Sequence, residues 1–307
     1  MRISTQTLFD TGAARIGELQ SSLVKTQQQI GTGRRVLTPA DDPVAAARAL
    51  EVSQSQSLNT QYAVNRQHAK GSLGAVEGTL SSVTLLLQDV KTTVIAAGNG
   101  TLSDTERGFM ATELRGRFEE LLGLANSRDA LGNYLFSGFQ TTTPPFAEAA
   151  VDTGTAVVAS AAYQGDQGQR HAQVDSMRQM AVSSSGQAVF QGGGQDVFQT
   201  LGELIERLKT PGTDGLADAL GIANTRIDTA LDNVLTIRAS VGARLQELDA
   251  LDNAGEDRHI QYSQILSDLQ DLDYTEALTR LSQQQVTLEA AQRSFVTISG
   301  LSLFKFL

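Results

Sequence analysis

The sequence has 307 residues and a formal net charge of −10, with 40% hydrophobic but only 5% aromatic residues. This length and apolar content suit two or three folded domains rather than a disordered chain. The negative charge argues against binding to nucleic acid or to anionic membranes, because both require clustered Lys and Arg. The absence of cysteine excludes disulfides, thiolate metal sites and cysteine nucleophiles.

The first residues contain no apolar stretch that could form the core of a signal peptide. No apolar run approaches the length of a membrane span. We therefore expect neither a cleaved leader nor a membrane partner. Any export would have to use machinery that reads a different signal.

The chain opens with an apolar stripe formed by Ile16, Leu19, Leu23 and Ile30, which predicts a helix with one apolar face. The segment that follows it ends at Asp41, Asp42 and Pro43. An acidic residue before proline is typical of a helix start, so we interpret Asp42 as a cap and Pro43 as the first helical position.

Two long segments carry apolar residues at alternating steps of three and four, the pattern of a coiled-coil seam. Between them, Ser103 and Glu106 form a capping box that opens a helix running toward Leu131. A short helix is predicted around Val197–Leu208, and the second long helix begins near Asp214 after Pro211-Gly212. An extra step of four before Leu245 predicts a stutter. The seam residues are Leu73, Val76, Leu80, Val83, Leu87, Val90, Val94 and Ala97, then Leu220, Ala223, Ile227, Ala230, Val234, Ile237 and Val241.

The helical period disappears over residues 137–195, where Gly, Ser, Thr and Val dominate. Val157, Val158 and the approach to Tyr163 predict a strand, and Val182 to Phe190 predicts further short strands. We interpret this segment as a small β-rich insert at the tip of a helical rod. A disordered linker is the alternative, but apolar residues recur throughout the segment.

A second apolar stripe lies near the end of the chain, after a predicted cap at Asp273. These residues must be covered by the first helix or by neighbouring subunits, so the pattern favours assembly. Gln284 and Gln285 fall within the stripe, either as tolerated polarity or as a device that fixes the register. The stripe and the closing residues are Leu281, Leu288, Ala291, Phe295, Ile298, Leu301, Leu303, Phe304 and Leu307.

No catalytic or cofactor pattern accompanies these helices. His68, His171 and His259 are widely spaced and form no metal-binding motif. The paired carboxylates Asp41-Asp42 and Asp271/Asp273 could serve acid–base or metal chemistry, but they lie where helices begin and capping explains them better. The sequence therefore predicts no enzyme, no metal and no cofactor.

Several motifs at the element boundaries carry a family resemblance. Gly31–Pro43 resembles the segment that joins the terminal helix to the rod in the hook–filament junction proteins of the flagellin superfamily. Gly132–Gly138, Tyr163–Asp166, Leu272–Ala277 and Ser302–Leu307 are similar to other motifs of that family. The resemblance covers essentially the whole chain and implies a mainly α, flagellin-like elongated rod, with coiled-coil helices from both termini paired and a small β-rich insert.

The resemblance also implies three regions: a terminal coiled-coil assembly domain (1–40 with 265–307), a helical rod (41–136 with 196–264) and a solvent-facing insert (137–195). The implied function is a homo-oligomeric ring that connects the hook, through its hook-associated protein, to the flagellin filament. An extracellular flagellar location follows, reached by type III export with a cytoplasmic chaperone on the C-terminal helix. The alternatives are a flagellin filament subunit and a secreted helical adhesin or tip protein.

Overall fold

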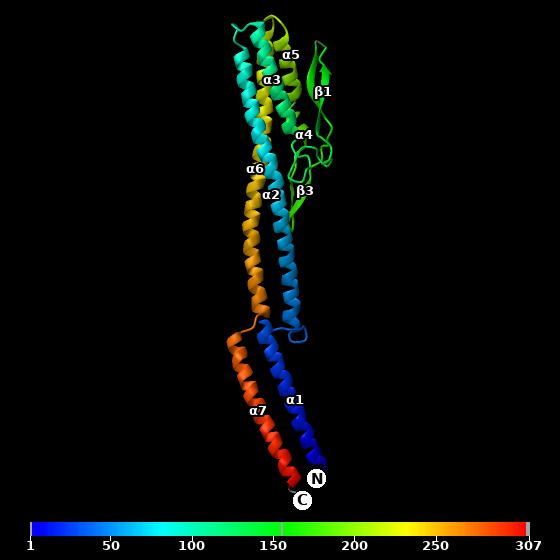
Figure 1. The fold of residues 1–307 in the computed structure, drawn as a ribbon, viewed down its shortest axis with the longest axis vertical. Helices are drawn as coiled ribbons and strands as arrows, with labels where there is room; N and C mark the ends of the chain where they lie inside the picture. Colours follow the sequence, from blue (N-terminus) through cyan, green and yellow to red (C-terminus); the bar gives the residue numbers. More distant parts are fainter. Residues whose placement is uncertain (1, 155, 305–307) are drawn as a thin grey trace. The chain divides into compact units, whose positions relative to one another are not determined.

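The computed structural model describes residues 2–154 and 156–304 and divides into two compact units. Unit 1 comprises Met1–Leu58 and Asp257–Leu307, and unit 2 comprises Asn59–Glu256. The division falls within the two longest helices, α2 and α6 (Figure 1). The elements are α1 (Arg2–Thr32), α2 (Pro43–Ala97), α3 (Asp104–Ala125), β1 (Phe146–Asp152), β2 (Val157–Tyr163), β3 (His171–Asp175), β4 (Arg178–Ala181), α4 (Gly186–Phe190), α5 (Val197–Lys209), α6 (Leu216–Gln270) and α7 (Tyr274–Phe304).

The predicted mainly α fold with a small β-rich insert is confirmed. The chain forms two compact units, which do not test the division into three regions. The predicted three-region organisation therefore stays a prediction. Among the described helices, none combines the length and the apolar character that crossing a bilayer requires.

In unit 2, α2 and α6 pack along the seam that the heptad spacing predicted. Leu80, Val83 and Val90 of α2 are completely buried, as is Ile227 of α6. Polar pairs flank the seam, with Lys91 Nζ 2.5 Å from Asp228 Oδ1 and Arg238 Nη2 2.7 Å from Glu77 Oε1. The apolar layers supply the burial, and the flanking charges keep the outer faces of both helices in water.

The helix α3 begins with the predicted capping box: the Ser103 hydroxyl accepts from Glu106 N, and the Glu106 carboxylate accepts from Ser103 N. The helix ends at Ala125, earlier than predicted. Asp129 Oδ1 accepts from the backbone N–H groups of Leu131 and Asn133. This local side-chain hydrogen bonding competes with helix continuation, so Leu131 lies in an exposed loop.

The insert contains two separate antiparallel hairpins, β1–β2 and β3–β4. The predicted strand at Val157–Tyr163 is β2, which pairs with β1 from Phe146↔Tyr163 to Asp152↔Val157. The strand predicted near Val182–Phe190 is wrong, because Gly186–Phe190 forms the short helix α4. Its cap is the Ser185 hydroxyl, which accepts from Ala188 N and starts a helical turn.

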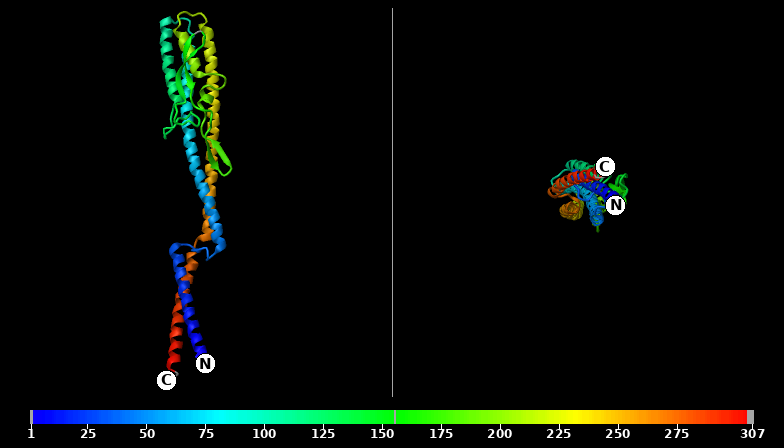
Figure 2. Two further views of the ribbon diagram at one scale, coloured as in Figure 1. Left: turned by 90° about the vertical axis from the view of Figure 1, so that its right-hand side faces the viewer. Right: turned by 90° about the horizontal axis from the view of Figure 1, so that it is seen from below.

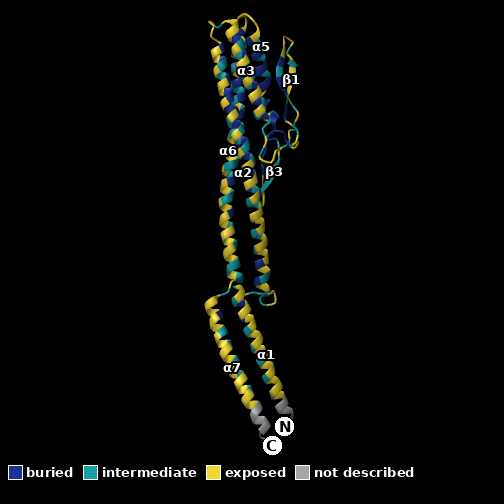
Figure 3. Cartoon of the chain, in the orientation of Figure 1, coloured by how far each residue is buried: buried dark blue, intermediate teal, exposed yellow. Residues whose placement is uncertain are grey.

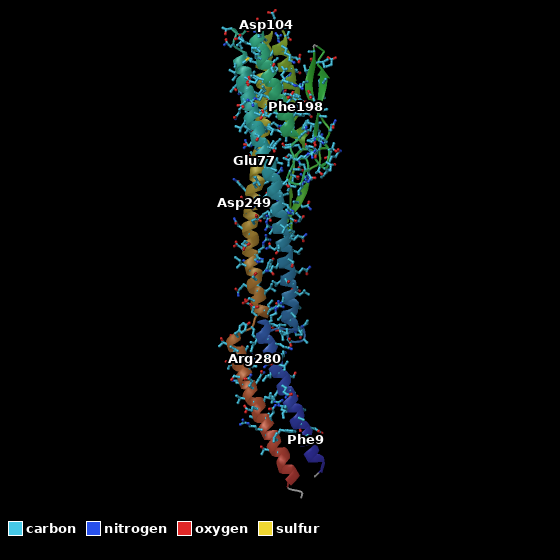
Figure 4. All side chains as sticks on the ribbon, viewed as in Figure 1. Phe9, Glu77, Asp104, Phe198, Asp249 and Arg280 are labelled. Atoms are coloured by element: carbon cyan, nitrogen blue, oxygen red, sulfur yellow. The ribbon has the colours of Figure 1, made fainter. Side chains whose placement is uncertain are left out.

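An aromatic cluster packs the insert against α3 and α5. Phe198 of α5 lies edge-on to Phe118 of α3, with ring centroids 5.7 Å apart, and 5.2 Å from the Phe146 ring of β1. Phe198 is labelled in Figure 4. Gly202 lets β2 approach α5 closely, because a Cβ there would overlap the Ala159 carbonyl oxygen. The core of unit 2 therefore joins helices and strands, and its buried residues are seen in dark blue in Figure 3.

Candidate functional site: the terminal helix pair

The first and last helices of the chain, α1 and α7, pack closely against each other within unit 1. They run antiparallel, with the N- and C-termini at the same end of the pair in both side views (Figures 1 and 2). The rings of Phe9 and Phe295 are in contact at that end, with centroids 4.7 Å apart and planes inclined by 50°. The pairing of terminal helices predicted from the sequence is therefore confirmed.

Close approaches at both ends of the pair define its register. At one end, a Cβ on Gly12 would lie 2.8 Å from Phe295 Cδ2, and at the other a Cβ on Gly33 would lie 2.9 Å from the Tyr274 hydroxyl. Both contacts therefore bring an aromatic ring against a backbone that lacks a side chain. Gly12 lies on α1 and Gly33 directly follows its end, three heptads further along the chain, and the two aromatic residues are three heptads apart on α7.

This register places a small or polar residue opposite a larger one in most layers of the seam. Such alternation lets two helices interdigitate at close range without voids. Extending this register between the end layers Gly12/Phe295 and Gly33/Tyr274 gives the intermediate layers Ile16/Ala291, Leu19/Leu288, Leu23/Gln284, Thr26/Leu281 and Ile30/Ala277.

The predicted seam residues lie along this interface but are only partly buried. The half-buried residues are Ile16, Leu19, Leu23, Ile30, Leu281, Leu288, Ala291 and Phe295, while Ile298 is 49% exposed. Described side chains of α7 end at Ile298, so Leu301, Leu303, Phe304 and Leu307 lie outside them. Thus a two-helix pair leaves one side of its own seam open, which Figure 3 shows as the prevalence of yellow on α1 and α7.

Several small and polar residues that the pair buries were missed in the sequence. Thr26, Gln29 and Ala277 are 3%, 7% and 1% exposed, and Gly12 lies against Phe295. An apolar pattern overlooks small and polar residues. Heptad steps taken from Leu23 and Leu281 would have reached Thr26 and Ala277.

The two glutamines singled out in the sequence have different environments. Gln284 lies in the seam, where its Nε2 donates to Ser22 Oγ at 2.7 Å. Gln285 is exposed, so its assignment to the seam was wrong. The helical rotation of about 100° per residue turns Gln285 away from α1.

The connection between α1 and α2 is tied down by both predicted carboxylates. Asp41 Oδ2 accepts from Leu37 N and Thr38 N, while Asp41 Oδ1 lies 2.6 Å from Lys25 Nζ. The Lys25 ammonium and the Thr38 N–H lower the pKa of the Asp41 carboxyl to about 2. Asp42 Oδ1 accepts from Ala45 N at 2.9 Å, as expected for a cap in front of Pro43, which begins α2.

This connection also binds the neighbouring one between α6 and α7. Arg35 N donates to Gln270 O at 2.7 Å, and Leu272 N donates to Gly33 O at 3.0 Å. Asp273 Oδ1 then accepts from Thr275 N and Glu276 N at the start of α7. Hydrogen bonds thus join the segment that follows the C-terminal end of α1 to the segment that precedes the N-terminal end of α7.

The chemistry available in this region is that of packing and hydrogen bonding. Within the described residues, no cluster of His, Asp and Glu side chains could hold a metal ion. His68, His171 and His259 lie on α2, β3 and α6, and all three are exposed.

Known proteins similar to this chain are flagellar. Residues 3–141 match the bacterial flagellin N-terminal helical region. Flagellar hook-associated protein 3 of Escherichia coli K12 is 35% identical over 99% of both chains, as is its counterpart in Salmonella typhimurium LT2. The flagellar junction protein FlgL of Legionella pneumophila has a similar fold, with a TM-score of 0.60 and 20% identity over 73% of this chain and 100% of that one. Because the sequence similarity extends over the full length of both relatives, the chain belongs to the flagellar hook-associated protein 3 family.

Proposed function

We propose that copies of this chain form a ring at the hook–filament junction, and that α1 and α7 are the elements through which the ring assembles. Family membership already makes the chain a structural protein of the bacterial flagellum rather than an enzyme. The ring would bind the hook-associated protein of the hook on one side and flagellin on the other. The terms hook-associated and junction in the names of its relatives support these two partners.

The observation that carries the proposal is the incomplete burial of the α1–α7 seam. In unit 2, seam leucines such as Leu80 are completely buried. In the terminal pair Leu19 and Leu288 stay half-buried, and Leu278 and Val296 on α7 are 54% and 67% exposed. Neighbouring copies would cover this surface, because apolar burial is the main driving force for association.

Each of the three predicted regions would have a separate role in the ring. Residues 1–40 and 265–307 would form the assembly domain, residues 41–136 and 196–264 the rod, and residues 137–195 the insert that faces solvent. We also propose that the chain reaches the cell exterior without a cleaved signal peptide, escorted by a cytoplasmic chaperone that holds α7. Binding of the chaperone to α7 would cover the open side of the α1–α7 seam until the ring assembles.

The assembly role is tested by placing a charge on the open side of α7. Val296→Asp and Leu278→Asp should leave the α1–α7 pair intact, since both side chains already contact water, and should abolish incorporation into the junction. An added carboxylate would be buried without a partner only in the assembled state. Gln283→Asp adds the same charge at an exposed polar position of α7 and serves as the control.

Incorporation is measured by motility and by immunoelectron microscopy of flagella. Normal incorporation of both variants would refute the proposed surface. Unlimited self-polymerisation of the purified chain would instead indicate a filament subunit. Binding to a host surface that survives deletion of α7 would indicate an adhesin.

A further inference from the structure

A buried cation interrupts the apolar seam between α2 and α6 in unit 2. The Arg66 side chain is 1% exposed although guanidinium groups stay charged in proteins. Arg66 continues the heptad series of Leu73 and Val76 along α2, and Asp252 continues the series of Leu248 along α6. Arg66 Nε donates to Asp252 Oδ1, so an ion pair fills a layer that apolar residues fill elsewhere.

The Arg66 guanidinium, carried by α2, contacts both α6 and β3. Arg66 Nη1 donates to the Val174 carbonyl oxygen of β3 at 3.1 Å. Gly255 of α6 makes room for the group, because a Cβ there would lie 2.5 Å from Arg66 Nη2. Lys70 Nζ lies 2.5 Å from Asp252 Oδ2 and 2.7 Å from Asp249 Oδ1, which adds a second cation to the same carboxylate. Asp249 is labelled on α6 in Figure 4.

The hairpin β3–β4 spans the two long helices at this point. A two-stranded hairpin is marginally stable alone, so its attachments decide whether it stays folded. Asn65 Nδ2 of α2 donates to Gln173 O at 2.8 Å, and Arg244 Nη1 of α6 donates to Ala181 O at 3.2 Å. At the turn, Arg178 makes a two-point ion pair with Glu247 of α6, at 2.7 and 2.9 Å.

We infer that Arg66 anchors the β3–β4 hairpin to α2 and α6, and that together they hold these two helices in a single register. Layers of Leu and Val are nearly equivalent when one helix slides past the other by a heptad, so they specify register weakly. The ion-pair layer is not equivalent, because sliding would leave the Arg66 charge buried without a partner. This inference concerns unit 2 and does not depend on the proposed junction role.

Amide hydrogen exchange resolved over residues 171–181 tests the attachment of the hairpin. Arg66→Met keeps an unbranched apolar stem and removes the charge and the hydrogen-bond donors, and should accelerate exchange there by about tenfold or more. Arg178→Met removes an exposed ion pair of the same hairpin and should accelerate exchange less than about threefold. Equal, small effects of both variants would overturn the inference.

Cysteine cross-linking tests the register, since the natural chain contains no cysteine. A short bismaleimide should link Lys91→Cys to Asp228→Cys, whose parent side chains meet, but not to Leu235→Cys, one heptad further along α6. With Arg66→Met, the Leu235→Cys product should increase at the expense of the Asp228→Cys product. An unchanged pattern would show that the ion pair does not set the register.

Two milder variants keep the test decisive if Arg66→Met fails to fold. Arg66→Lys retains a charge for Asp252 but cannot also reach Val174 O, so it should loosen the hairpin and keep the register. Gly255→Ala displaces Arg66 Nη2 without altering any charge and should also accelerate exchange in the hairpin. Unchanged exchange in both variants would show that Arg66 does not anchor the hairpin.

Discussion

The ring of Phe295 lies against the backbone of α1 at Gly12, where even a single added methyl group would approach Cδ2 to 2.8 Å. Phe9, one turn earlier on α1, contacts the same ring at a tilt of 50°. An aromatic residue of α7 is thus seated in a notch formed by the absence of a side chain on α1. This notch, together with Gly33 facing Tyr274, sets the spacing and the register of the terminal pair.

Two glycines of α1 should respond differently to the same substitution. Gly17 has open space around its Cα, so Gly17→Ala should stabilise α1 by up to about 1 kcal/mol through helix propensity. Gly12→Ala should gain less or lose stability, because the Phe295 ring must move. Amide exchange along α1 measures both effects, and equal stabilisation by the two variants would contradict the notch.

Leu288→Asp should separate α1 from α7 even in the free chain, since Leu288 is half-buried opposite Leu19. Unpaired burial of a carboxylate is unfavourable by several kcal/mol in an apolar contact. The matched variant Thr287→Asp places the same charge on the exposed face and should leave the pair intact. Exchange protection of α1 reports the outcome. Loss of helical protection in unit 2 with Leu288→Asp would show that the two units do not fold separately.

The Asp41 carboxylate should stabilise the α1–α2 connection in a pH-dependent way. Its pKa of about 2 in the folded chain lies below the ordinary value of 3.8, because of Lys25 and the Thr38 N–H. The stabilisation is therefore complete above pH 4 and is lost as the pH falls through about 2.

Nuclear magnetic resonance titration of the Asp41 carboxyl carbon, with the Thr38 amide as reporter, measures this transition. Asp41→Asn should give the same loosened connection at neutral pH and should remove the transition at the Thr38 amide. A midpoint near 3.8 in the natural chain would mean that Lys25 does not stabilise the carboxylate.

Gly202→Ala should destabilise unit 2 by about 1–3 kcal/mol, since the new methyl group would overlap the backbone of β2 at Ala159 and the strand would have to shift. Gly116→Ala in α3 meets no neighbour and should instead stabilise by up to about 1 kcal/mol. Denaturant midpoints monitored by helical circular dichroism distinguish the two. A neutral Gly202→Ala would contradict the close packing of β2 on α5.

Phe198→Ala should destabilise unit 2 by about 3–5 kcal/mol, because Phe198 is completely buried and contacts rings from α3, β1 and α4. The exchange protection of α1 and α7 should not change, because both helices belong to unit 1. The measurement is amide hydrogen exchange in unit 1 and in unit 2, compared between Phe198→Ala and the natural chain. A simultaneous loss in α1 would reveal coupling between the units.

The long helices could be predicted because their heptads repeat over many turns and their boundaries carry capping residues such as Ser103. The hairpin β3–β4 could not, since only Val174 and Met180 are buried in it and its other contacts are polar bonds to α2 and α6. Periodicity records which residues are apolar, and therefore says little about elements that polar contacts hold in place.

The same limit applies to the candidate site. Leu19, Leu23 and Leu288 were found because they are apolar at helical spacing, whereas Gly12 and Ala277 contribute by being small. Their role depends on the residue opposite them, which a single helix pattern does not contain. Likewise Arg66 looks like a surface residue in the sequence until the position of Asp252 on a helix far along the chain is known.

The pairing of α1 with α7 also has a consequence for synthesis. Thr32 ends α1 and Tyr274 begins α7, so every intervening residue must be translated before the partner of α1 exists. At roughly 5–20 residues per second, the first helix waits about 12–50 s with its seam uncovered. An isolated helix of this kind is marginal in water, so for that interval the nascent chain exposes Ile16, Leu19 and Leu23 to whatever binds unfolded apolar segments. The order of the helices thus makes the terminal pair the last part of the chain that can form.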